Sequence, residues 1–496
     1  MDYQFLLAVE TRAAPVSRQR RLYNNLRAAI AAERLAARHR LPSSRELAEQ
    51  LGIARNTVVH AYEQLHSEGY LNTNRRGTFV AALAAVAAAR KGRPPHPRTS
   101  IAISRRIRAV RQRQAPVDIA LPFKPGIPAL DAFPMKEWQL SLRRACASLR
   151  PRDLGYGDAR GNILLRTAIS DRLRAARSVR CTPDQVFVTN GTQSTLDLLA
   201  RALADVGDTV WVESPGYGGA RAAFTAAGLA VQPVHVDGAG IDLNAVKRLK
   251  TPRLIYVTPS HQYPLGSVLS LQRRMELINI AWRSNALILE DDYDSDFRFS
   301  GEPLPALQGL VEDAPVLYLG TFSKTMFPGL RLGFLVVPAA AVEPISSIYN
   351  SLERHGRQTE QLALAQFMIE GRYTRHLNRM RKLYGERQRL LREALSRYLP
   401  HLPMEGAEAG LHLVLRLPQG ADDVEFVRRA REHGLSPGPL SLCGHKLTPE
   451  LSGLVLGYGN LAASQVGDHV RVLAMLCKRI GSKKAAAASF KILQDA

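Results

Sequence analysis

The stretch Gly320-Thr321-Phe322-Ser323-Lys324-Thr325 follows the apolar run 316–319, and Arg331 stands seven residues beyond its lysine. The apolar run predicts a buried strand, so the polar groups gather where that strand ends. A lysine amine can hold an aldehyde as a Schiff base, while hydroxyls and an arginine fork can bind a phosphate. Pyridoxal phosphate carries both groups. The alternative is a surface lysine that follows a strand, and this stretch alone leaves it open.

Three other segments place polar or aromatic groups after apolar runs. Asn190-Gly191-Thr192-Gln193 opens a predicted helix, whose first amides and Thr192 hydroxyl can bind a phosphate, although many loops contain Asn-Gly. Tyr217 can stack on a pyridine ring, although a lone tyrosine is usually packing. Glu290-Asp291-Asp292-Tyr293 is the stronger signal. A strand has no structural need of three terminal carboxylates, whereas a pyridine nitrogen needs one to stay protonated.

The chain from residue 117 to residue 480 predicts an α/β fold. Apolar strands alternate with amphipathic helices, which indicates a large, mostly parallel sheet with helices on both faces. Residues that follow different strands then converge, because ligands bind beyond the carboxyl ends of parallel strands. A long helix over 373–397 and a smaller C-terminal α+β unit with a strand over 412–417 should follow. The expected strands of the large sheet are 186–188, 210–212, 254–257, 286–289, 316–319 and 334–337.

Residues 10–80 predict a separate small domain. An apolar stripe within 18–37 indicates one helix, Ser43 and Glu46 have capping-box spacing for a second, and 54–67 indicates a third. Two short strands then flank the basic segment 72–77. Three helices followed by a basic hairpin are typical of a winged helix-turn-helix, whose third helix enters the major groove of DNA.

Charge supports a polyanionic partner for the N-terminal part. The formal net charge is +23, and residues 1–116 hold 21 Lys and Arg against 7 Asp and Glu. Within this part, 81–116 is rich in proline, alanine and arginine and predicts an extended basic linker. A solvated linker is favoured over one that contacts DNA phosphates. The tail over 481–496 lacks an amphipathic pattern and is expected to be disordered.

The four cysteines show no CxxC pair, so neither a disulfide framework nor a metal site is expected. The longest apolar run, 80–89, is too short to span a bilayer. We therefore expect a soluble, cytoplasmic protein that does not bind membranes.

The N-terminal domain resembles the GntR family of bacterial regulators. The resemblance implies operator DNA as partner; the alternative is a small helical cap with solvated arginines. The matching motifs are Leu41-Pro42-Ser43-Ser44-Arg45-Glu46-Leu47-Ala48, Ala54-Arg55-Asn56-Thr57-Val58, Glu68-Gly69-Tyr70-Leu71 and Arg76-Gly77-Thr78-Phe79-Val80. The expected DNA-binding residues are Ser44, Arg45, Arg55, Asn56, Thr57, Arg75, Arg76 and Gly77.

Residues 118–478 resemble the fold-type I aminotransferases, and the two resemblances together match the MocR subfamily of GntR-type regulators. The resemblance implies pyridoxal phosphate on Lys324, Asp291 opposite the pyridine nitrogen, Tyr293 on the ring oxygen and Tyr217 stacked on the ring. It also implies a homodimer, with Tyr156 reaching into the partner subunit's site. The phosphate contacts expected from it are Gly191, Thr192, Gln193, Thr321, Ser323 and Arg331.

One departure from the aminotransferase pattern affects the predicted function. Leu454-Val455-Leu456 places Val455 where aminotransferases carry the arginine that binds the substrate carboxylate. We therefore expect a transcriptional regulator that senses pyridoxal phosphate, or an amine reacting with it, rather than an enzyme. The alternatives are an active aminotransferase with an attached DNA-binding module, and a binding protein that has lost the cofactor. Arg379, Arg381 or Arg416 can still supply a carboxylate clamp from another direction.

Overall fold

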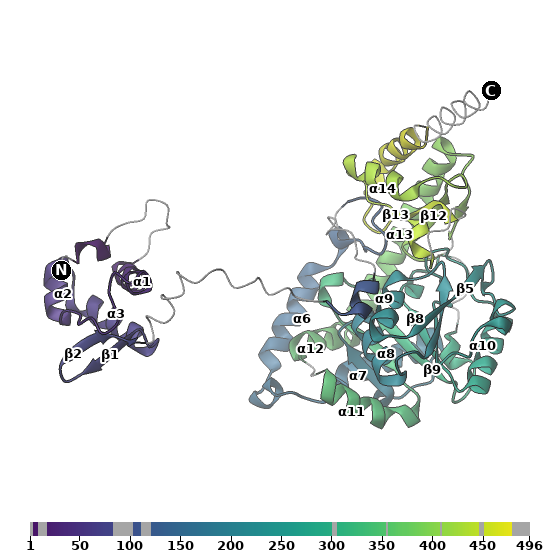
Figure 1. Cartoon of the computed structure of the whole chain (residues 1–496). Coiled ribbons are helices and arrows are strands. Elements are labelled where there is room, and N and C mark those ends of the chain that lie inside the picture. Colours follow the sequence, from purple (N-terminus) through teal and green to yellow (C-terminus); the bar gives the residue numbers. More distant parts are fainter. Residues whose placement is uncertain are drawn as a thin grey trace. The chain divides into compact units, whose positions relative to one another are not determined.

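The computed structural model of the protein forms two compact units, Met1–Ala102 and Ile103–Ala496 (Figure 1). Most of the predicted linker over 81–116 and the whole predicted tail over 481–496 lie outside the described residues. The structure describes residues 3–7, 17–82, 103–110, 121–299, 305–353, 356–406, 409–445 and 451–478.

The first unit is a winged helix-turn-helix, as predicted. The second helix begins with a capping box, in which the Ser43 hydroxyl accepts from the Glu46 amide and the Glu46 carboxylate accepts from the Ser43 amide. It ends at Gly52, which has the left-handed φ of +61° that glycine tolerates. The elements are η1 (Gln4–Leu7), α1 (Arg18–Ala31), α2 (Ser44–Leu51), α3 (Arg55–Ser67), β1 (Leu71–Asn74) and β2 (Gly77–Val80).

The hairpin of this unit is longer than the sequence suggested. β1 and β2 pair from Leu71↔Val80 to Asn74↔Gly77, so the tip consists of Arg75 and Arg76 alone. The Asn74 side chain accepts a hydrogen bond from the Arg76 amide at 2.8 Å and closes this turn. The two arginines are therefore held on a tight, exposed turn.

The second unit is built on an eight-stranded sheet. Neighbouring strands are parallel except around β10, which is antiparallel to both of its neighbours, and at the β5–β6 edge. The mostly parallel α/β sheet and all six predicted strands are confirmed. The order is β3 (Val186–Thr189), β10 (Gly333–Val336), β9 (Val316–Thr321), β8 (Leu287–Asp292), β7 (Leu254–Val257), β4 (Thr209–Ser214), β5 (Ala230–Asp237) and β6 (Gly240–Ile241).

Helices cover both faces of this sheet. Phe187 and Leu317 point to the side of α8, α9 and α11, whereas Val186 and Tyr318 point to the side of α7, α12 and α13. Every helix among the described residues is too short or too polar to cross a bilayer. The helices are α5 (Arg105–Ala109), α6 (Met135–Ser148), α7 (Ile163–Arg177), α8 (Thr192–Leu203), α9 (Gly218–Ala227), α10 (Leu271–Ser284), α11 (Val342–Leu352), α12 (Gln358–Ile369), α13 (Arg372–Tyr398) and α14 (Asp423–Glu432).

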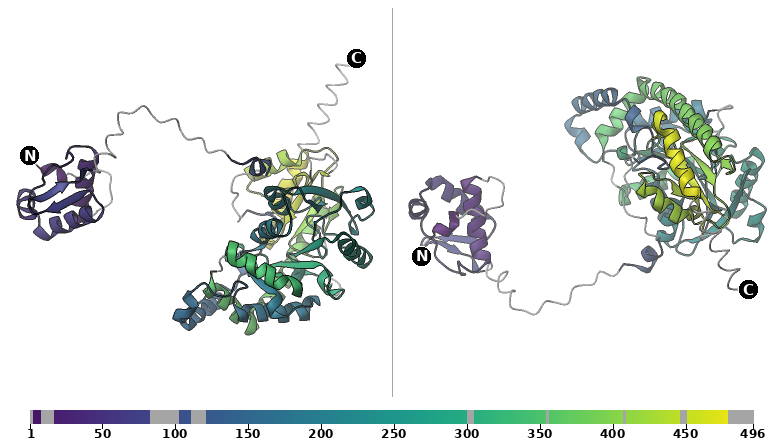
Figure 2. Two further views of the ribbon diagram at one scale, coloured as in Figure 1. Left: turned by 60° about the horizontal axis from the view of Figure 1, so that its bottom comes forward. Right: turned by 90° about the horizontal axis from the view of Figure 1, so that it is seen from above.

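A second, antiparallel sheet forms the core of the C-terminal part, whose yellow-green elements gather on one side of the unit (Figure 2). Its strand over 412–417 was predicted to within one residue. The order is β11 (Met404–Glu405), β12 (His412–Arg416), β14 (Gly453–Gly457) and β13 (Gly438–Pro439).

Candidate cofactor site and DNA-binding surface

The predicted cofactor residues lie around the carboxyl ends of β8 and β9. These strands are parallel neighbours, with Asp291 opposite Leu319 and Asp292 opposite Gly320. Lys324 follows β9 and is half-buried. Its Nζ donates a hydrogen bond to the Gly126 carbonyl at 2.7 Å. Gly126 has φ +75°, and a Cβ there would lie 2.8 Å from Nζ, so only glycine lets this segment approach the amine.

Asp291 is a buried carboxyl with one unsatisfied oxygen. Its Oδ2 accepts from the Tyr256 hydroxyl at 2.7 Å, while its buried Oδ1 has no hydrogen-bond partner among the described residues. Burial raises the pKa of Asp291 to about 7, against the lowering effects of Tyr256 and the Lys324 charge. An unsatisfied buried acceptor is costly, and the N–H of a protonated pyridine is the donor that would satisfy it. The site therefore fits the cofactor.

The other two carboxylates of this strand have structural partners, which corrects the expectation that they had no structural role. Glu290 accepts from the Leu307 and Gln308 amides at 2.8 and 3.0 Å. Asp292 forms a buried ion pair with Arg177 at 2.8 Å. Burial alone would raise the pKa of Asp292, but the Arg177 charge together with the hydrogen bonds from Ser295 and Tyr318 outweighs it and holds that pKa below its ordinary value.

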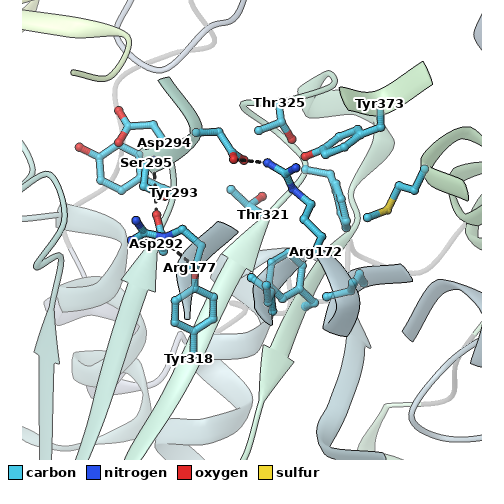
Figure 3. Close-up of a pocket in the computed structure, with 16 residues that line it drawn as sticks. Arg172, Arg177, Asp292, Tyr293, Asp294, Ser295, Tyr318, Thr321, Thr325 and Tyr373 are labelled. Carbon is cyan, nitrogen blue, oxygen red and sulfur yellow. Dashed lines mark hydrogen bonds and ion pairs between the residues drawn. The ribbon is translucent and has the colours of Figure 1, made fainter. Parts of the chain in front are cut away.

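The Arg177–Asp292 pair lines a pocket that Tyr293 and Thr321 also line, and Figure 3 shows Tyr318 reaching the same carboxylate. Arg172 from α7 points into this pocket and pairs with Asp296. The cavity measures about 30 Å³, which is enough for water but far too small for an effector. The Arg177–Asp292 pair in this pocket therefore supports the end of β8.

The predicted phosphate residues come from three segments that the fold brings close. Gly191 has φ +92° and precedes α8, which begins at Thr192. A Cβ on Gly191 would lie 3.8–3.9 Å from the Arg331 guanidinium, so these two positions are adjacent. The Thr321 hydroxyl accepts from the Ser323 amide at 3.1 Å. A helix N-terminus beside an exposed arginine is a suitable anion site.

Aromatic side chains border the site. The Tyr217 hydroxyl lies 3.4 Å from the Gln193 side chain, whose amide donates to the Gly219 carbonyl at 2.9 Å. The Tyr263 ring makes edge contacts with Tyr217 and Tyr293, both at 6.1 Å between centroids. The two tyrosines predicted to contact the cofactor, Tyr217 and Tyr293, therefore both contact Tyr263.

Tyr156 is 72% exposed. Its predicted role in a partner subunit's site stays a prediction. Four neighbours of the predicted site residues were not predicted from the sequence: Tyr256, His261, Asp294 and His412. The sequence gives little signal for them, because they are single polar residues in distant segments, with Tyr256 within β7 and His412 at the start of β12, and only the fold brings them together.

Val455 is fully buried in an apolar cluster. It pairs with Val414 of β12 and Gly438 of β13, and packs with Val414, Leu440 and Leu265. The three arginines considered as substitutes are engaged elsewhere. Arg416 forms two hydrogen bonds with Glu405, Arg379 donates to the Ala132 carbonyl, and Arg381 donates to the Asp296 carbonyl.

The predicted DNA-binding residues lie on one end of α2, the start of α3 and the hairpin. Arg45, Arg55 and Asn56 are exposed, Ser44 and Thr57 are half-buried, and the Arg55 guanidinium donates to the Ser44 hydroxyl at 3.4 Å. Arg75 and Arg76 form the exposed hairpin tip. Gly77 has φ +128°, and the Arg40 guanidinium lies 3.1 Å from where its Cβ would be.

Two family profiles match the chain: "Bacterial regulatory proteins, gntR family" over residues 18–80 and "Aminotransferase class I and II" over residues 126–439. The chain is 41% identical to the probable rhizopine catabolism regulatory protein MocR of Rhizobium meliloti, over 94% of this chain and 95% of that protein. It is 32% identical to the pyridoxine biosynthesis transcriptional regulator PdxR of Corynebacterium glutamicum, over 90% of this chain and 93% of that protein.

Among solved structures, the chain is similar to LysN, an α-aminoadipate aminotransferase of Thermus thermophilus complexed with N-(5'-phosphopyridoxyl)-L-leucine. The TM-score is 0.68 at 27% identity, and the match covers 76% of this chain and 96% of that one.

Proposed function

The chain belongs to the MocR-type transcriptional regulators of the GntR family, and from this premise we propose that it senses pyridoxal phosphate at Lys324. It is a DNA-binding regulator with an aminotransferase-like domain. A cytoplasmic location fits a regulator that binds operator DNA.

The observation that carries the proposal is the unsatisfied Oδ1 of Asp291. Bound pyridoxal phosphate supplies an aldehyde for attachment to a lysine and a ring that withdraws electrons. Asp291 would pair with the ring nitrogen, and Lys324 would hold the aldehyde. Tyr217 would stack on the ring, and Tyr293 would donate to its oxygen. The phosphate would be bound by Gly191, Thr192, Gln193, Thr321, Ser323 and Arg331.

We also propose a homodimer. The segment 154–164 exposes apolar side chains, and Leu154 is 76% exposed. Exposed apolar groups gathered in one segment are typical of an interface. Tyr156 lies within this segment, so a second subunit that covers it would receive its hydroxyl. The exposed members are Leu154, Tyr156, Ile163 and Leu164.

The DNA-binding proposal rests on the exposed basic residues of the first unit. Arg55 and Asn56 at the start of α3 would read base edges, and Arg45 with Ser44 and Thr57 would support them. Arg75 and Arg76, with Gly77 beside them, would contact phosphate or the minor groove.

An active aminotransferase is the second candidate, and the likeness to LysN favours it. Val455 opposes it, because a substrate carboxylate loses its hydration in a closed site and needs an arginine to offset that loss. The apolar packing of Val455 and the other bonds of Arg379, Arg381 and Arg416 provide no such offset. We therefore favour pyridoxal phosphate itself as the signal.

The proposal is tested by loading the full-length protein with pyridoxal phosphate, reducing it with borohydride and mapping the adduct by mass spectrometry. We expect a pyridoxyl group on Lys324 and, in a parallel binding assay, an operator affinity that depends on the cofactor. An adduct on another lysine would contradict the site, and an unchanged operator affinity would contradict the sensing role.

A further inference from the structure

His261, Asp294 and His412 form a buried polar cluster beside Tyr293. His261 and Asp294 are each 2% exposed. His261 Nδ1 lies 3.0 and 3.1 Å from the two carboxyl oxygens of Asp294 and 3.1 Å from the Tyr293 hydroxyl. A single ring nitrogen therefore faces both a carboxylate and the tyrosine that would contact the cofactor.

We infer that His261, held by Asp294, is a positioning residue that fixes the Tyr293 hydroxyl as a hydrogen-bond donor toward the cofactor's ring oxygen. This inference rests on the proposed function, because it concerns how the cofactor is bound at Lys324.

The direction of the hydrogen bonds follows from what each group can do. Burial raises the pKa of Asp294, whereas the contact with His261 lowers it. In its ionised form this carboxylate only accepts, and His261 Nδ1 then carries a proton and donates it to Asp294. The same N–H faces the Tyr293 oxygen, which then accepts as well. The Tyr293 proton must therefore point elsewhere, and the described residues supply it with no second acceptor. An oxygen of a bound ligand is the acceptor that remains.

The protonation of Tyr293 is secure at neutral pH. Burial raises its pKa well above the ordinary value for tyrosine, and the charge of Asp294 raises it further. The hydroxyl thus keeps a proton to donate.

The surrounding backbone is shaped for the His261–Asp294 pair. Gly410 has φ +83°, and a Cβ there would lie 2.2 Å from His261 Cε1 and 2.4 Å from Asp294 Oδ2. Any side chain at this position would displace both groups. On the far side of the ring, His261 Nε2 is buried and has no partner among the described residues. The ring thus makes its hydrogen bonds through Nδ1 alone, although leaving Nε2 unpaired has a cost.

A metal ion is the other ligand that this cluster suggests, since one ligand atom from each of the three residues lies within 4.8 Å of the others. The observed contacts favour hydrogen bonding instead. Asp294 contacts Nδ1 directly, and His412 Nε2 lies 3.0 Å from the Pro264 carbonyl. Metal analysis is included in the test.

Other charged groups face this cluster and must stay unchanged in the variants compared. Lys324 and Asp292 act on Asp294, and Lys324 also acts on His412. Asp291, Glu213 and the Tyr263 hydroxyl act on Tyr293.

The experiment titrates the visible absorbance of the cofactor in the full-length holoprotein against pH. A donor at the ring oxygen stabilises its anionic form and so lowers the pKa of the lysine nitrogen that shares a proton with it. Loss of one such hydrogen bond should raise the midpoint by about one to two pH units. We expect this rise in Tyr293→Phe and in His261→Leu.

A double-mutant cycle separates positioning from a general structural effect. The combined Tyr293→Phe/His261→Leu variant should show no more than the Tyr293→Phe shift, because His261 acts only through the Tyr293 hydroxyl, which Tyr293→Phe already removes. His261→Asn keeps an N–H near the Nδ1 position and should restore the wild-type midpoint to within a few tenths of a unit. His235→Leu, at an exposed histidine of β5, is the matched control and should show no shift.

Four results would overturn the inference. They are a wild-type midpoint in His261→Leu, additive shifts in the double variant, failure of His261→Asn to restore the midpoint, and a stoichiometric metal ion that His261→Leu loses. A wild-type protein with no visible absorbance would instead contradict the proposed function. The inference then has its own test, the ¹⁵N shifts of His261 in the cofactor-free protein, where a proton on Nε2 rather than Nδ1 would contradict it.

Discussion

The two sides of the candidate site differ in what they retain of an aminotransferase. The large sheet supplies polar groups for a cofactor, with Lys324 after β9 and the unsatisfied Asp291 oxygen at the end of β8. The small sheet supplies an apolar cluster around Val455 where a carboxylate clamp is expected. The residues that would hold a cofactor thus lie on a different sheet from the position expected to bind an amino acid carboxylate. A site with the first and without the second is suited to sensing.

Replacing Lys324 with alanine should have the largest effect on the cofactor side. Without an amine there is no covalent attachment, so the visible absorbance of the lysine-bound cofactor should vanish entirely. Spectra of the purified protein after addition of pyridoxal phosphate check this. Lys382→Ala is the control, on the exposed surface of α13. A remaining lysine-bound spectrum in Lys324→Ala would contradict the assignment.

Replacing Val455 with arginine tests the apolar side of the site, on the small sheet. Because Val455 is fully buried among apolar groups, an arginine there would be overpacked and its charge unpaired, at a cost of about 2–4 kcal/mol in the free energy of unfolding. Urea unfolding measures this cost, with Val455→Ile as a small apolar control. A variant as stable as the wild type that also reacts with amino acids would show that the clamp pocket is preserved and merely vacant.

Removing the charge of Asp291 tests whether its carboxylate binds the ring nitrogen of the cofactor. Asp291→Asn should weaken binding of pyridoxal phosphate by about 10- to 100-fold, because a charge-assisted hydrogen bond contributes about 1.5–3 kcal/mol. Equilibrium titration followed by absorbance measures the change, and Glu312→Gln at an exposed carboxylate is the control. Equal affinities in the two variants would argue against Asp291 as the partner of the ring nitrogen.

The raised pKa of Asp291 predicts a pH dependence of stability in the cofactor-free protein. The native state holds the proton up to about pH 7, whereas the unfolded state releases it near pH 3.8. The native state therefore binds more protons between these values, and stability should fall as pH rises through this window. Buried Glu213, with a pKa of about 7, adds in the same direction. Urea midpoints from pH 5 to pH 8 should fall less steeply in Asp291→Asn, and identical slopes would contradict the prediction.

The smallest effect is expected in the DNA-binding unit. Arg55→Ala should cost about 1–3 kcal/mol of operator binding and relax the preference at one base, whereas Arg75→Ala should mainly reduce the salt dependence. Footprinting at several salt concentrations distinguishes them. Unchanged affinity and preference in Arg55→Ala would remove α3 as the reading helix.

The sequence predicted the helices and strands better than the contacts between their side chains. The six strands and the winged helix-turn-helix follow from apolar periodicity and capping, which are local. β5 was missed because Pro233 and the exposed His235 interrupt its apolar pattern, as is typical of a strand near a sheet edge.

The partners of the site residues were harder to predict, because they come from distant segments. Arg177 pairs with Asp292 across 115 residues, and Asp294 binds His261 across 33. Nothing in the spacing of residues 290–294 indicates which carboxylate is structural and which is left unsatisfied. In the folded protein, Glu290 and Asp292 are buried beside hydrogen-bond donors, whereas Asp291 is buried with one oxygen unpaired.

We propose that the site holds pyridoxal phosphate without processing amino acids. The most direct measurement mixes the holoprotein with a panel of amino acids and follows the cofactor spectrum together with keto acid formation. We expect the lysine-bound spectrum to persist and no keto acid to be released. Rapid conversion to the pyridoxamine form with release of a keto acid would contradict this proposal and establish an active aminotransferase.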